Sequence, residues 1–241
     1  MSAAVREIAP EQRTWVRVAA VLVFVKHALE LLGDSVTIIG RTGKTFAETV
    51  QFATESQELW RLCLLEVGLA WLTVAVWAFA LYVVLAPVDR RLAQLALILR
   101  LGASFVGASS VMFRMAQSWI FRATADGTFT VEQLRLLSGV MSRASGAGVI
   151  LGWMAQSAGA LLFWVLFLRS RYVPRWVAVL GIVGSVLLFG ASAVMFVYPQ
   201  RINELKLLGL VSLLADVIAA VWLLTRGLPR AKAPALVEDA S

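Results

Sequence analysis

Long apolar stretches separated by polar connections constrain the fold of this chain more than any other feature of its sequence. About 20 residues of α-helix, each adding about 1.5 Å, cross the hydrocarbon core of a bilayer. The 241-residue chain is 60% hydrophobic and 15% charged, with a mean hydropathy of +0.80, which is too apolar for a soluble domain. The pattern predicts six transmembrane helices, at about residues 15–40, 60–86, 92–121, 139–168, 176–197 and 205–225.

The predicted fold class is all-α, a polytopic membrane helix bundle formed by residues 15–226. We expect residues 1–14 to be a cytoplasmic amino-terminal segment and residues 227–241 to be a disordered cytoplasmic tail. In the first outer connection, Thr45 and Glu48 have the spacing of a capping box, and apolar residues follow at helical intervals. This pattern predicts a short amphipathic helix at the membrane surface.

Basic residues in the short connections predict the orientation of the bundle, because Lys and Arg are enriched on the cytoplasmic side of membranes. The connections 87–91 and 169–175 together carry five arginines and the single acid Asp89. The longer connections on the other side contain more acids, and the second of them holds another capping-box pattern, Thr130 to Gln133. We therefore expect a multi-pass protein of the plasma membrane with both termini in the cytoplasm.

The first predicted helix carries a polar face within an otherwise apolar stretch. Lys26, His27, Glu30 and Asp34 fall within about one third of the helix circumference. A charge near the bilayer centre costs about 2.5 to 3.5 kcal/mol on insertion scales, so this face must be turned toward protein or a wet cavity. The sequence therefore predicts a buried polar centre.

With the charged residues of the later spans, and without His27, the predicted helices contain three Lys or Arg residues and four Asp or Glu residues away from their ends. Buried charges are paired or neutralised, because an isolated ion in a low dielectric is costly. We expect structural ion pairs in which Lys26 or Arg100 faces Asp216. The charged residues of the later spans are Glu66, Arg100, Arg114 and Asp216.

Buried ionisable groups in membranes are candidates for function. The leading hypothesis is a protein that binds or handles a small molecule or a lipid from the outer half of the membrane. Arg114 is either part of such a site or the ion-pair partner of Glu66 or Asp34. The candidate ligand-binding residues are Glu30, Asp34, Glu66, Arg114 and Trp77.

A second hypothesis is a membrane-embedded acid/base enzyme that acts on an isoprenoid or another lipid. A protonated carboxyl in an apolar site can donate a proton, and deep tryptophans can stabilise a developing cation. Fungal integral-membrane terpene cyclases are similar in size and in having acids on an early and a late span. The candidate catalytic residues are Glu66, Asp216 and His27. The third hypothesis is a purely structural protein with an ion-paired core.

Residue counts argue against several other classes. Cys63 is the only cysteine and His27 the only histidine, so neither a disulfide nor a His/Cys zinc site is expected, and we expect no metal and no cofactor. Much of the net charge of +7 lies beside the predicted spans, where Lys and Arg fix orientation, so no nucleic-acid partner is expected. The expected partners are membrane lipids and a small-molecule or lipid ligand.

The connection Ser170-Arg171-Tyr172-Val173-Pro174-Arg175-Trp176, followed by Gly181 and Gly184, resembles the signature of a bacterial integral-membrane family, domain of unknown function 4386. The similarity in layout extends from about Trp15 to Thr225 and implies a six-helix bundle. Members of that family often have an acid two residues after Arg-Leu in the third span, where this chain has Ala103 after Arg100-Leu101. The resemblance implies an architecture without an assigned activity.

Overall fold

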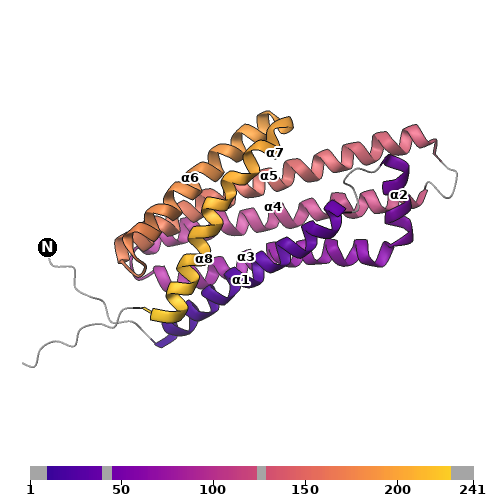
Figure 1. Ribbon diagram of the computed structural model, residues 1–241. Coiled ribbons are helices and arrows are strands. Elements are labelled where there is room, and N and C mark those ends of the chain that lie inside the picture. Colours follow the sequence, from indigo (N-terminus) through magenta and orange to yellow (C-terminus); the bar gives the residue numbers. More distant parts are fainter. Residues whose placement is uncertain (1–9, 40–44, 124–128, 229–241) are drawn as a thin grey trace, which may run out of the picture.

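The computed structural model describes residues 10–39, 45–123 and 129–228, and every regular element within them is a helix (Figure 1). The long helices are α1 (Pro10–Ile39), α3 (Gln57–Leu85), α4 (Arg90–Ala123), α5 (Val131–Ser170), α6 (Arg175–Val197) and α8 (Gly209–Arg226). The shorter ones are α2 (Phe46–Glu55), η1 (Pro199–Arg201), α7 (Ile202–Leu205) and η2 (Lys206–Leu208). The all-α prediction is confirmed.

Five of the described helices, α3, α4, α5, α6 and α8, are long and apolar enough to cross a bilayer. This composition identifies a multi-pass membrane protein. α1 is not one of the five, although it has 30 residues, because charged residues recur along it. The number of six spans therefore stays a prediction. α1 packs along α3 and α8 inside the same bundle.

Both capping boxes form as the sequence predicts. The Thr45 and Thr130 side chains each accept a hydrogen bond from the backbone N–H three residues on, at 3.3 Å. The first box begins α2, which confirms the short helix in the first long connection. The second begins α5 at residue 131, so the prediction of a connection reaching residue 138 is wrong. Hydropathy misplaced this boundary because the first turns of α5 are amphipathic rather than apolar. The last helix also begins later than predicted, at residue 209, after the turns around Pro199.

The α4–α5 hairpin is longer than a bilayer is thick. With 34 and 40 residues, these helices are about 50 and 60 Å long, against about 30 Å for the hydrocarbon core. α6 and α8 have only 23 and 18 residues. The hairpin therefore extends beyond them at the end where α2 lies (Figure 1). The opposite end holds the start of α1 and the end of α8.

Glycines let large side chains enter the helix interfaces. A Cβ atom at Gly181 of α6 would overlap the indole of Trp164 on α5. A Cβ atom at Gly159 of α5 would lie 2.8 Å from Cγ of Arg100 and 2.9 Å from the carbonyl oxygen of Ala96 on α4. Close packing of this kind drives helix association in membranes, because lipid tails are as apolar as the interior of the bundle and the hydrophobic effect contributes little there.

Gly181→Ala should therefore destabilise the bundle, because the added methyl group meets an indole that is itself buried. Over-packing of this kind costs about 1 to 3 kcal/mol. Thermal unfolding of the protein in detergent measures it. Gly190→Ala on the same helix is the matched control, since no described atom lies within 4 Å of its added Cβ. Equal melting temperatures for the two variants would contradict the packing described here.

Candidate functional site

The polar face of α1 forms a three-residue cluster. The Glu30 carboxylate accepts a hydrogen bond from Lys26 Nζ at 3.1 Å, and its Oε2 lies 3.0 Å from Nδ1 of His27. Lys26 is buried, with 3% of its surface exposed, whereas His27 and Glu30 are half-buried. The face is thus turned partly into the bundle, as a charged stripe within a membrane requires. Lys26 is thus paired with Glu30, and no ion pair of 4.0 Å or less joins it to Asp216 among the described residues.

Arg100 of α4 lies in the middle of the bundle, with 2% of its surface exposed. Its Cζ atom is 4.5 Å from the ring centroid of Trp77 on α3, and its aliphatic stem packs on Gly159 of α5. A desolvated cation over an indole face gains about 2 kcal/mol. Nε and Nη1 of Arg100 have no hydrogen-bond partner among the described residues. The guanidinium is therefore only partly satisfied by protein.

Asp216 of α8 shares a small cavity with Arg100. Five helices meet there, and Trp77, Phe163 and Trp164 form much of the wall. The cavity measures about 30 Å³, which is room for about one water molecule. No ion pair of 4.0 Å or less joins Arg100 to Asp216 among the described residues. The predicted pair therefore makes no direct contact, and the cavity has room for one water molecule that could bridge the two charges.

The remaining predicted residues do not join this centre. Glu66 and Arg114 are half-buried on α3 and α4, and neither forms an ion pair with a described residue. The predicted pair of Arg114 with Glu66 does not form. The Asp34 side chain lies outside the part of the chain that the structure describes.

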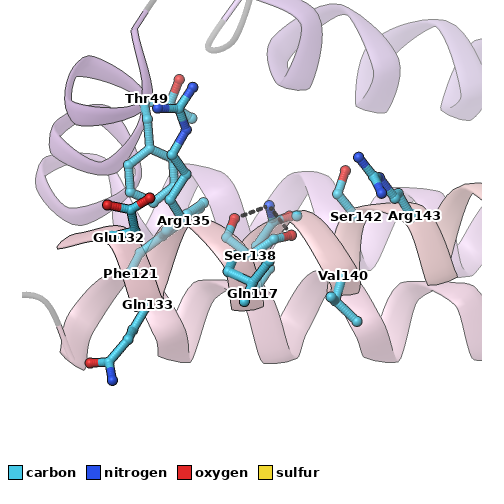
Figure 2. A pocket seen from close by; sticks show the side chains of 13 residues that line it. Thr49, Gln117, Phe121, Glu132, Gln133, Arg135, Ser138, Val140, Ser142 and Arg143 are labelled. Atoms are coloured by element: carbon cyan, nitrogen blue, oxygen red, sulfur yellow. Dashed lines mark hydrogen bonds between the residues drawn. The ribbon is translucent and has the colours of Figure 1, made fainter. Parts of the chain in front are cut away.

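A second, larger site lies in the extended end of the α4–α5 hairpin. α2 crosses this end, and a groove of about 720 Å³ runs between α2, α4 and α5 (Figure 2). Apolar side chains from all three helices, among them Phe46, Phe121 and Val140, form part of its wall. The Phe46 and Phe121 rings pack edge to face at 6.1 Å. A groove of this volume is in the range of small-molecule sites, about 300 to 1,000 Å³.

Polar groups of the groove wall come mainly from α5. Gln117 Nε2 of α4 donates a hydrogen bond to Ser138 Oγ at 2.7 Å, and both side chains are buried. Arg135 and Arg143 lie on either side of this pair (Figure 2). Both arginines are exposed, and neither forms an ion pair with a carboxylate of the described residues. The groove thus combines two unpaired cations with apolar surface.

Sequence reasoning missed the groove because it assigned residues 122–138 to a connection. The capping box at Thr130 was the available signal, since a helix that starts there places Arg135 and Arg143 beside the end of α4. Within the described ranges, no three His, Cys, Asp or Glu side chains lie close enough together to hold a metal ion.

In a comparison with known proteins, the model of a family described as domain of unknown function (DUF4386) matches residues 18–227, which include α2 to α8 and most of α1. No curated protein and no solved structure matches the chain.

The central cavity leads to a prediction about Arg100 and Asp216. Removing one partner of a buried pair costs about 3 to 5 kcal/mol, because the survivor is uncompensated, whereas removing both can be nearly neutral. Arg100→Leu and Asp216→Leu should each lower the free energy of unfolding in detergent, and the double variant should recover much of the loss. We expect a coupling term larger than about 1 kcal/mol.

The exposed pair of Arg169 and Asp89, 3.4 Å apart, is the matched control. The corresponding single and double leucine variants of these two residues should give a coupling term below about 1 kcal/mol, because solvent screens exposed ions. Strictly additive losses at Arg100 and Asp216 would show that the cavity does not connect them.

Proposed function

We propose that this chain, which belongs to the family described as domain of unknown function DUF4386, binds an anionic amphiphile in the groove between α2, α4 and α5. By anionic amphiphile we mean a molecule with a charged head, such as a phosphate or carboxylate, and an apolar body. The ligand reaches the groove from the outer half of the membrane or from its outer surface. The observation that carries the proposal is the pair of unpaired arginines beside the apolar wall of the groove.

Volume favours the groove over the central cavity as the ligand site. The groove has about 720 Å³ and the central cavity about 30 Å³. An isoprenoid or another lipid does not fit in the space of one water. The cluster around Arg100 is therefore proposed as a structural centre, and the acid/base enzyme is not the function that this geometry favours.

Chemistry favours an anionic head in the groove. A guanidinium offers several N–H donors in a planar fork that matches phosphate and carboxylate oxygens. Glu132 also lines the groove, but Arg135 and Arg143 retain this capacity because no described carboxylate lies within 4.0 Å of either guanidinium. Apolar side chains such as Phe46 and Val140 offer the complementary surface for the body of the ligand.

The proposed membrane placement makes α1 the sixth span. Support comes from the burial of Lys26 and from the packing of α1 between α3 and α8. In this arrangement the arginine-rich connections lie in the cytoplasm of a cell whose plasma membrane holds the protein, and α2 lies outside. The groove is then on the outer face.

Replacement of the two arginines tests the proposed function. Purified protein in dodecyl maltoside, a neutral detergent, should bind dodecyl phosphate, and calorimetric titration measures the affinity. A hydrogen bond to a charged group contributes about 1.5 to 3 kcal/mol. Arg135→Gln/Arg143→Gln should therefore weaken binding at least about tenfold, since about 1.4 kcal/mol corresponds to a factor of ten.

Arg201→Gln is the matched control, because Arg201 is exposed in the connection between α6 and α8 and does not line the groove. Its affinity for dodecyl phosphate should equal that of the unchanged protein. If all three proteins bind alike, or if none binds, the groove is not a site for anionic amphiphiles.

Cysteine labelling tests the orientation. In a Cys63→Ser background, a cysteine at exposed Val131 should react with a membrane-impermeant thiol reagent in intact cells, and one at exposed Arg91 should not. The opposite pattern would place the groove on the cytoplasmic side.

A further inference from the structure

A second hollow lies at the end of the bundle opposite to α2. It measures about 520 Å³ and lies between the α5–α6 connection and the end of α8. Arg171 and Arg175 come from the connection, and Trp222 and Arg226 come from α8. The connection is the same segment that carries the family resemblance, and the groove near α2 does not involve it. We call this hollow the hairpin pocket.

Three unpaired cations surround the hairpin pocket. Arg171, Arg175 and Arg226 are exposed, and none of them forms an ion pair with a described carboxylate. The neighbouring Arg169 differs, because it lies 3.4 Å from Asp89. The pocket therefore has an uncompensated charge, and an anion is the complementary ligand.

The backbone and an aromatic ring fix the positions of these cations. Arg171 ends α5 in the left-handed conformation, with φ of 58°, which turns the chain sharply toward α6. Arg226 lies with Cζ 5.3 Å from the ring centroid of Trp222, a cation–π arrangement that limits its motion. The Arg226 guanidinium is thus held on one side of the pocket, and the backbone of Arg171 fixes the path of the chain on the other side.

The start of α6 adds a further attraction for an anion. Pro174 precedes its first residue, Arg175, and no side chain of the described residues caps this terminus. Free N–H groups and the positive end of the helix dipole attract negative charge there. The helix has 23 residues, long enough to carry a full dipole.

The location of the pocket points to lipid rather than to a soluble anion. α6 begins and α8 ends here, and both helices have apolar stretches long enough to cross a bilayer, so the pocket lies at the depth of the lipid headgroups. Trp176 is 61% exposed beside it, as expected for an aromatic residue in the interfacial belt. Tyr172 and Trp222 give the pocket apolar surface next to its charges.

We infer that the hairpin pocket binds the phosphate headgroup of an anionic phospholipid from the leaflet that faces the arginine-rich connections. The phosphate lies between Arg175 at the start of α6 and Arg226 at the end of α8. It therefore links α6 to α8 at an end of the bundle where no chain connection joins these two helices. Basic pockets between transmembrane helices on the cytoplasmic side are suited to such headgroups. This site is independent of the groove that binds the amphiphile in the proposed function.

The test compares lipids retained by the purified full-length chain. The protein is placed in nanodiscs with equal amounts of phosphatidylglycerol and phosphatidylcholine, and native mass spectrometry after release counts the bound lipids. We expect phosphatidylglycerol to be retained in clear excess. Arg175→Gln/Arg226→Gln should reduce this excess at least fivefold.

Arg90→Gln/Arg91→Gln is the matched control, because it removes two exposed charges from the other short connection at the same end of the bundle. This variant should keep the excess of phosphatidylglycerol. An equal loss in both variants means that the arginines attract anionic lipid only through their general charge and overturns the site. Equal retention of both lipids by the unchanged protein overturns it as well.

A charge-preserving variant keeps the inference testable if the glutamine variant does not fold. Arg175→Lys/Arg226→Lys retains the net charge but loses the planar fork that grips a phosphate. It should retain less phosphatidylglycerol than the unchanged protein, and full retention would contradict the assigned contacts. The loss of dodecyl phosphate binding caused by Arg135→Gln/Arg143→Gln should be the same in this variant as in the unchanged protein, which separates the hairpin pocket from the groove.

Discussion

The structure depends on the high free energy of a charge in a low dielectric. Arg100 cannot be placed in the middle of the bundle unless protein replaces the water around its guanidinium. Three helices take part in this replacement: α3 supplies the Trp77 ring, α5 supplies the space at Gly159, and α8 supplies Asp216 across the cavity. The contacts of these helices around Arg100 meet this requirement.

Much of the fold could be predicted from the sequence because it depends on local signals. Apolar length located α3, α4, α6 and α8 to within a few residues, and the side-chain spacing at Thr45 located α2. The polar face of α1 was also predictable, since helical periodicity alone groups Lys26 with Glu30. These features do not depend on which helices become neighbours.

Partner choice could not be predicted, because it depends on the rotation and depth of each helix. The sequence left Lys26 and Arg100 as alternative partners of Asp216, whereas Lys26 forms its ion pair one turn along its own helix, with Glu30. The groove was missed for a related reason: Arg135 and Arg143 lie on an amphipathic segment that hydropathy does not identify as part of a long helix. Only the capping box at Thr130 indicated that the helix begins there.

Because α4 and α5 are long and uninterrupted, a small tilt of either helix produces a large displacement at its end. Gln117 in the groove and Arg100 at the centre lie on one uninterrupted helix, about 25 Å apart at about 1.5 Å per residue. Ser138 and Gly159 are similarly placed on α5. A ligand that separates α4 from α5 at the groove would tilt both helices about their contact at Gly159. The ends of α4 and α5 at the groove would then move the most, because they lie farthest from this contact, and the close packing of Arg100 on Gly159 would resist the tilt.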